Sequence, residues 1–496
     1  MKKNKKLYVL LAFLIVIFTM SIVEKTMQND TFFYIPIGKY IAQTHTIDGL
    51  DHWSFHSDLK FMYPGWICKL GMYLLYTAFG FTGIYVCVLI TSAMIAIIFF
   101  NTLLKEKHTL WLSFLVTLIA IVFGGRHIFC ARNQLFSFFC FSLEYYCLQG
   151  LMERGEKKYF WFLILVAFIL LNVHDTVYPI FFVLLLPYLF EVVVSKCVRL
   201  GDTAKIQYSD LKNKKYIVLL FLIAIFVGFC TPIFGTAYTN LLSAVDGVGV
   251  QFIAEMQPVN IMMNIPIIFM VSLLFGILCF TKTKVKLKDL LFTVGFLIMG
   301  SLNYRSYPFI LMIGGITCTN IFSSFLRTYI TEEKIELFSR KLDSSKLWIT
   351  VVFCMLSIFS IYLFSEQAKK QYVDDLTYPI AETDYILRKL DYKNIRIWTH
   401  YNFGSYLELY GIPVFIDSRA EMFIEQMNEG CTVLEDWINT SDGKVHYKQT
   451  FEKYGITHVL VYNTETINLY LQEDTNYRLL YRSTIFSLYE KEESEE

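Results

Sequence analysis

Asp30 is the residue whose type and position most strongly predict chemistry in this chain of 496 residues. It stands in the stretch QNDTFFYIP, residues 28–36, a few residues after a long apolar run. A carboxylate held at that height beside a lipid surface can take a proton from a hydroxyl group, which is general-base chemistry. We therefore predict that Asp30 is catalytic, although a solvated acid after a helix is the simpler alternative.

Other acids, imidazoles and guanidinium groups lie in segments between the apolar runs. The predicted substrate-binding residues are His52, His56, Arg126, Arg132, His174, Asp175, Glu255 and Arg305. Guanidinium forks suit phosphate, so the arginines, together with His174, are the candidates for a phosphate contact. A charged residue at a membrane boundary needs a partner, and for Arg305 we expect a phosphate or Asp175.

Structural roles compete with several of these functional ones. Arg126 and Arg132 could instead anchor the chain at lipid headgroups. His52 and His56 are four residues apart and could bind a metal on a helix, but DHWSFHSD favours a plain loop. Asp417 and Arg419 follow a predicted strand, where they form either a site or a structural ion pair. The sequence requires no cofactor; a divalent cation stays open, and no metal ligands are assigned.

The composition places these residues in a membrane protein. Hydrophobic residues make up 55% of the chain and charged residues only 18%, against about 25% in soluble proteins. The formal net charge of +1 argues against a nucleic-acid partner, because binding to a phosphate backbone needs a clear basic excess. The 45 Phe and 33 Tyr residues suit lipid-facing helices and interface belts.

Apolar runs predict about eleven membrane-spanning helices. They lie near residues 7–23, 80–103, 108–124, 135–150, 159–173, 176–195, 216–233, 260–281, 288–302, 306–326 and 347–364. A further run at 66–79 is interrupted by glycine, and it is either an interfacial helix or a twelfth span. With eleven spans and a cytoplasmic N-terminus, inner segments hold 24 Lys and Arg residues and outer loops hold 7, as the positive-inside rule requires.

The composition changes near residue 365, which predicts two domains. Residues 1–364 form the transmembrane domain, with a first outer loop at 24–79, and residues 365–496 form a small extracytoplasmic α/β domain. In the latter, the stretches IRIWT, PVFID, HVLVYN, RLLYR and FSLYE predict strands, while AETDYILRKL and YKQTFEKYG predict helices. Alternation of strands and helices favours a largely parallel sheet.

The charged residues predicted to lie outside suit one reaction. A sugar on a polyprenyl phosphate presents its anomeric carbon at headgroup level, and its transfer needs a base, cations for the departing phosphate and charge stabilisation. The segments NDTFFYIPIGKY, RNQLFSF, NVHD, TPIFGTAY, EMQPV, YRSYPF and HYNFGSYLELYGIPVFIDSRAEMF resemble, in this order, a family of multi-pass proteins of the GT-C superfamily of membrane glycosyltransferases. That resemblance implies a GT-C architecture and places Asp30 at the position of the superfamily's catalytic acid.

We therefore expect a hexosyltransferase of the plasma membrane that uses a polyprenyl-phosphate sugar and an extracytoplasmic glycan or lipid acceptor. Two other classes remain open. A transporter or flippase of a lipid-linked glycan would place polar groups near the bilayer midplane and show repeats, and the runs here are apolar and unrepeated. A non-catalytic envelope scaffold would not need the carboxylate of Asp30.

Overall fold

The computed structural model describes residues 5–201, 203–243 and 254–492, which divide into two compact units. Unit 1 comprises residues 1–25, 85–238 and 253–369, and unit 2 comprises residues 26–84, 239–252 and 370–496. The first outer loop thus belongs to the same unit as the C-terminal residues, whereas composition alone grouped it with the transmembrane part. The expected boundary at residue 365 falls inside helix α17, which runs from Lys346 to Lys369.

Unit 1 is built from helices, and every one of the eleven apolar runs contains one. The main helices are α1 (Lys5–Ile22), α3 (Trp66–Lys105), α4 (Leu110–Ala120), α6 (Asn133–Met152), α7 (Lys158–Val173), α8 (Pro179–Cys197), α9 (Lys214–Val227), α12 (Ile265–Phe280), α13 (Leu287–Leu302), α15 (Gly315–Tyr329) and α17. Among the described residues, seven helical segments are long and apolar enough to cross a membrane, and α7 and α12 are shorter apolar helices. Large apolar side chains face outward on the helices of unit 1, such as Trp161 on α7 and Phe226 on α9, which are 71% and 72% exposed. These features make the chain a multi-pass membrane protein.

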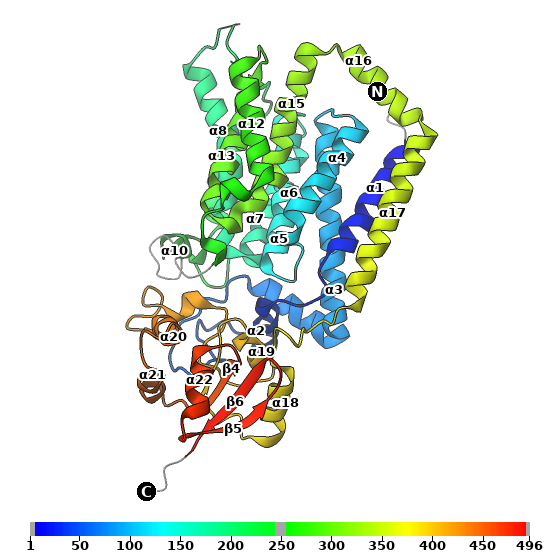
Figure 1. Cartoon of the computed structure of the whole chain (residues 1–496). Coiled ribbons are helices and arrows are strands. Elements are labelled where there is room, and N and C mark those ends of the chain that lie inside the picture. The colour runs from blue at the N-terminus through cyan, green and yellow to red at the C-terminus, as the bar shows by residue number, and fades with distance from the viewer. Residues whose placement is uncertain (1–4, 202, 244–253, 493–496) are drawn as a thin grey trace. The chain divides into compact units, whose positions relative to one another are not determined.

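Shorter elements complete unit 1. They are the π-helical turns η1 (Ile121–Gly125) and η6 (Ile310–Gly314), the short helices α5 (Arg126–Ile128), η2 (Asp175–Val177), η3 (Ala254–Met256), η4 (Ile261–Met263), η5 (Tyr304–Ser306), α14 (Tyr307–Phe309) and α16 (Glu332–Ser344), and the strands β1 (Ile206–Gln207) and β2 (Val285–Lys286). Helix α10 (Thr236–Ser243) begins in unit 1 and ends in unit 2. Helix α1 packs along α17, where the rings of Phe18 and Phe359 stack 6.3 Å apart (Figure 1). Helix α6 packs against α7, and α13 packs against α15 and η6.

Helix α3 begins in unit 2 and continues into unit 1, with a kink at Gly80. The backbone of Gly80 has φ 62° and ψ −156°, a conformation that side chains with a Cβ rarely adopt. The segment 66–79, which the sequence left open as an interfacial helix or a span, is therefore helical and separated from residues 81–105 by this kink. The number of spans stays a prediction.

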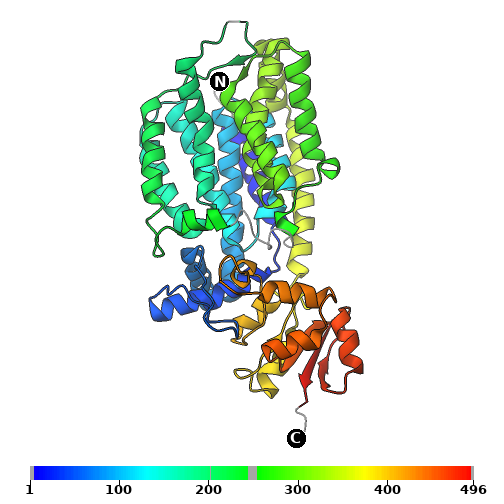
Figure 2. The same ribbon diagram turned by 90° about the vertical axis from the view of Figure 1, so that its left-hand side faces the viewer.

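Unit 2 contains a four-stranded sheet in the order β3-β4-β6-β5. Strands near the C-terminus, at the red end of the colour scale, are drawn as arrows in Figure 2. The elements of unit 2 are α2 (Asn29–Thr44), α18 (Ile380–Lys389), β3 (Ile397–Trp398), α19 (Gly404–Leu409), η7 (Ala420–Phe423), α20 (Val433–Ser441), α21 (Tyr447–Tyr454), β4 (His458–Tyr462), α22 (Thr466–Glu473), β5 (Tyr477–Arg482) and β6 (Phe486–Lys491). Four of the five predicted strands and both predicted helices are present. PVFID contributes only isolated bridges from Val414 to Ser54 and Ile397.

The expectation of a largely parallel sheet is wrong. Strands β3 and β4 pair in parallel, but β4 with β6 and β5 with β6 pair antiparallel. The reason is local, because only residues 483–485 separate β5 from β6, and so short a connection can join only antiparallel neighbours.

Candidate functional site

One end of unit 1 carries two arginines that share one carboxylate. The Nη1 atom of Arg132 lies 2.6 Å from Oε1 of Glu255, and Nη2 of Arg305 lies 3.3 Å from its Oε2. We call these three residues the Arg–Glu–Arg group. The sequence predicted all three as site residues but expected a phosphate or Asp175 beside Arg305, and the partner in the structure is Glu255.

Local backbone structure brings the three side chains of the Arg–Glu–Arg group together. Arg132 is the N-cap of α6, and Arg305 lies in η5, where its N–H donates to the side chain of Asn303. The segment that carries Glu255 is tied to the end of α13, because Tyr304 N donates to the carbonyl of Gln257 at 3.0 Å and Val259 N donates to that of Ser301 at 2.9 Å. The group is therefore set by the ends of two helices and one docked loop.

The electrostatics of the group leave it cationic. Burial raises the pKa of Glu255, but the charges and hydrogen bonds of Arg132 and Arg305 outweigh burial and hold that pKa below its ordinary value. The carboxylate therefore stays ionised and cancels one of the two positive charges. The side chains of Arg305 and Glu255 are 39% and 36% exposed, so a ligand from solvent or lipid can reach them.

Arg126 adds a further cation at the same end of unit 1. It is exposed, and within the part of the chain that the structure describes its side chain makes no hydrogen bond or ion pair, while its backbone N–H donates to the carbonyl of Gly124. The neighbouring His127 packs edge-on against the rings of Tyr304 and Tyr307, with centroids 5.0 and 5.2 Å away. Arg126 directly follows the π-helical turn η1, an irregularity often found at functional sites.

His174 and Asp175 lie where α7 ends. The Oγ atom of Ser137, in the first turns of α6, lies 2.7 Å from Nδ1 of His174 and donates to the carbonyl of Asn133. Asp175 is 4% exposed. Both residues are thus ordered within unit 1, and their predicted substrate role stays a prediction.

Asp30 lies in unit 2, in the first turn of α2, where the sequence predicted loop rather than helix. Acidic residues are common in the first turn of a helix, near the positive end of the helix dipole. The side chain of Asn29 donates to the carbonyl of Tyr401 at 2.9 Å, and the ring of Phe32 packs edge-on against Tyr378 and Tyr406. The backbone that carries Asp30 is therefore held by the C-terminal residues of unit 2.

His52 and His56 have separate partners, in a non-helical segment as expected. Nε2 of His52 lies 2.7 Å from Oδ2 of Asp48, and Nε2 of His56 lies 2.8 Å from the carbonyl of Phe415. Burial lowers the pKa of His56, so this imidazole is neutral near pH 7. No group of three or more His, Cys, Asp or Glu side chains that could hold a metal ion occurs among the described residues.

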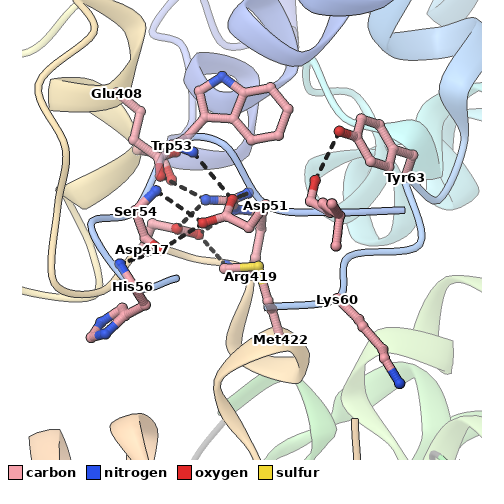
Figure 3. Close-up of polar contacts among 12 residues, drawn as sticks. Asp51, Trp53, Ser54, His56, Lys60, Tyr63, Glu408, Asp417, Arg419 and Met422 are labelled. Carbon is pink, nitrogen blue, oxygen red and sulfur yellow. Dashed lines mark hydrogen bonds and ion pairs between the residues drawn. The ribbon is translucent and has the colours of Figure 1, made fainter. Parts of the chain in front are cut away.

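Arg419 and Asp417 belong to a closed ionic cluster in unit 2 (Figure 3). The guanidinium of Arg419, 1% exposed, contacts Asp51, Glu408 and Asp417, each at 2.6 Å. We call these four residues the Arg419 cluster. Burial raises the pKa of Glu408, while burial of Asp51 is outweighed by the charge of Arg419, which holds the pKa of Asp51 low. The geometry is that of a structural ion network, the alternative that the sequence left open.

The sequence did not identify two buried groups. Glu408 lies on α19 within YLELY, where it is the only charged residue. A lone acid among apolar and aromatic residues is the sequence signal that could have identified it as buried. At the other end of unit 1, the ammonium of Lys288 is fully buried and lies 2.6 Å from Glu153 and 3.3 Å from Asp289. In the sequence Lys288 is only one of the charges of the inner segments, because its partner Glu153 is 135 residues away and leaves no local pattern.

Comparison with known proteins identifies the fold. No family model and no curated protein sequence matches the chain. Among solved structures, the Archaeoglobus fulgidus oligosaccharyltransferase in its apo form matches with a TM-score of 0.58 at 9% identity, over 92% of this chain and 70% of that one. The same enzyme tethered to an acceptor peptide with an NVT sequon matches with a TM-score of 0.56 at 9% identity, over 92% and 69%. ArnT from Cupriavidus metallidurans bound to undecaprenyl phosphate matches with a TM-score of 0.51 at 10% identity, over 98% of both chains. The chain therefore has a GT-C-like fold, a multi-pass helical part with a small α/β domain.

Proposed function

We propose that this protein is a membrane glycosyltransferase that transfers a hexose from a polyprenyl-phosphate donor to an extracytoplasmic glycan or lipid acceptor. The observation that carries the proposal is the Arg–Glu–Arg group with Arg126 at the same end of unit 1. Guanidinium forks match the oxygens of a phosphate, and an exposed cationic group next to lipid suits a lipid-linked phosphate. The GT-C-like fold supports this reading, since ArnT, one of the proteins it resembles, is solved with undecaprenyl phosphate.

The proposed roles follow from the chemistry of transfer. The bond from the anomeric carbon to the phosphate oxygen breaks, and Arg126, Arg132 and Arg305 stabilise the charge of the departing phosphate. A bond from the acceptor oxygen to the anomeric carbon forms, and the acceptor proton passes to the carboxylate of Asp30. Its place in the first turn of α2, a few residues after α1 in the sequence, supports this role.

The orientation of the chain across the membrane is also part of the proposal. Arg305 follows the end of α13, whereas Lys288 lies at its start, so the two occupy opposite ends of one helix. The positive-inside bias assigns the end with Lys288 to the cytoplasm and the end with Arg305 to the outside. On this assignment the N-terminus is cytoplasmic and the C-terminal domain is extracytoplasmic.

The test is a glycan and glycolipid profile of the cell envelope. The strains are a deletion and the deletion carrying the wild-type chain, Asp30→Asn or Asp58→Asn at matched protein levels. Asp58 is the matched control, an exposed acid whose φ of 62° asparagine tolerates well. We expect one sugar to disappear in the deletion, to stay missing with Asp30→Asn and to return with Asp58→Asn. A full profile with Asp30→Asn would instead support the scaffold or the transporter.

A further inference from the structure

We propose that Arg419 is a positioning residue: by binding Asp51 of the first outer loop, it fixes the position of helix α2 and of Asp30 on that helix. The inference rests on the proposed function in one respect, the catalytic role of Asp30. Its physical core, the attachment of α2 to the Arg419 cluster, is independent of that role. All the residues involved lie in unit 2.

The ion pair between Asp51 and Arg419 depends on how the Asp51 carboxylate is oriented. The Oδ2 atom of Asp51 accepts hydrogen bonds from N and Oγ of Ser54, at 3.0 and 2.5 Å. Its Oδ1 atom is therefore left to face Nη1 of Arg419 at 2.6 Å. The remaining guanidinium nitrogens bind Asp417 through Nε and Nη2, at 2.9 and 2.6 Å. The planar fork has one arrangement that satisfies all these contacts, so it fixes the loop relative to residues 417–419.

The same guanidinium touches α2 directly. Its Cζ atom lies 5.7 Å from the ring centroid of Phe33 and 5.0 Å from that of Phe61. The ammonium of Lys69 lies 5.8 Å from both of these rings as well. Two aromatic rings are thus shared by two cations, an arrangement that favours a definite position of Phe33, three residues after Asp30.

A second chain of contacts joins the start of α2 to the Arg419 cluster. Asn29 donates to the carbonyl of Tyr401, and the hydroxyl of Tyr401 donates to the carbonyl of Ser418 at 3.0 Å. Ser418 lies between the two cluster residues Asp417 and Arg419. Asp30 is therefore flanked by attachments on both sides, through Asn29 before it and Phe33 after it, and both lead to Arg419.

The composition of the Arg419 cluster indicates that it fixes local geometry more than it stabilises the fold. Three carboxylates surround one guanidinium, and Oε2 of Glu408 has no hydrogen-bond partner among the described residues. A buried ion cluster is weak evidence for stability, because desolvation offsets the attraction of the charges. A fork that accepts one arrangement does restrict geometry, and geometry is what a general base requires.

The experiment uses Asp51→Asn in the full-length protein, with Asp58→Asn as the matched control. Asp51→Asn keeps the shape of the side chain and leaves Arg419 paired with Asp417 and Glu408, so the fold survives. We expect the backbone amides of residues 31–35 and of Ile37 to exchange hydrogen roughly tenfold faster or more, as for loss of one charge-assisted hydrogen bond, with β4 and β6 unchanged. We also expect kcat to fall roughly 10- to 100-fold with an unchanged KM for the donor, because a misplaced base slows chemistry and not binding.

The two readouts separate failure of this inference from failure of the proposed function. Unchanged exchange in α2 with Asp51→Asn would overturn the inference, whatever the protein does. Full activity with Asp51→Asn in a series where Asp30→Asn is inactive would overturn it as well. Faster exchange in α2 together with full activity of Asp30→Asn would leave the attachment standing and refute the catalytic role of Asp30. Arg419→Lys keeps the positive charge and loses the guanidinium fork, so its α2 amides should exchange as fast as those of Asp51→Asn. Exchange at the wild-type rate in Arg419→Lys would show that the fork geometry does not hold α2.

Discussion

Replacement of Glu255 by glutamine tests whether the Arg–Glu–Arg group is a phosphate site whose charge the carboxylate moderates. In the wild-type chain Glu255 pairs with Arg132 and Arg305, so a phosphate must bind while this negative charge is nearby. Glu255→Gln keeps the shape and hydrogen-bonding oxygen of the side chain and removes the charge. We therefore expect the variant to bind polyprenyl phosphate more tightly than the wild type.

The magnitude follows from the distances. A phosphate on the two guanidinium groups would lie about 5 Å from the carboxylate, where two unit charges repel by roughly 3 kcal/mol at an effective dielectric constant of about 20. The Glu255 side chain is 36% exposed, so solvent screening reduces this to roughly 1–1.5 kcal/mol. The expected gain is then about tenfold in affinity. Arg305→Gln should lose about as much for the opposite reason, and the double variant should return close to the wild type.

The assay is equilibrium binding of undecaprenyl phosphate to the protein in nanodiscs of neutral lipid, at two salt concentrations. Undecaprenol without phosphate is the control ligand, and its binding should not change. Glu332→Gln is the control variant, since Glu332 is an exposed acid at α16 whose nearest partner, Arg327, lies 3.8 Å away. Weaker binding by Glu255→Gln, equal to the loss in Arg305→Gln, would refute the reasoning and show that Glu255 orients the arginines for the ligand.

Three further predictions concern stability and can be measured by urea or thermal unfolding. Burial raises the pKa of Glu465 to about 7, so its ionisation destabilises the folded state, and the free energy of unfolding should fall as pH rises from about 4.5 to 7. The variant Glu465→Gln should therefore be up to about 3 kcal/mol more stable than the wild type at pH 8 and no more stable at pH 4; a gain at both pH values would contradict this. Lys288→Met leaves buried carboxylates without their cation and should cost about 3–5 kcal/mol, unlike an exposed lysine, so a cost below 1 kcal/mol would show that the carboxylates are neutral. Gly404→Ala places a Cβ 2.0 Å from the carbonyl oxygen of Ile416 and should cost more than about 2 kcal/mol, whereas Gly276→Ala, with open space at that position on α12, should be neutral or stabilising; equal effects would refute the steric argument.

The sequence by itself determined the class of protein and most of its elements. All eleven apolar runs contain helices, and β3, β4, β5 and β6 lie where short apolar runs predicted strands. These features depend on the burial of neighbouring side chains against lipid or a core, which composition and period express directly. Helix α2, which contains the aromatic residues after Asp30, was not predicted, because it contains Pro36 and its apolar residues follow no clear helical period.

Only the tertiary structure decided which charged groups meet. Arg132 and Glu255 are 123 residues apart in the chain, and Asp51 and Arg419 are 368 apart. The sequence could predict both arginines as site residues, yet one lies in an exposed cationic group and the other in a closed network. No local pattern separates these outcomes, because the partner, the burial and the pKa of an ionisable group are set by residues that folding brings next to it.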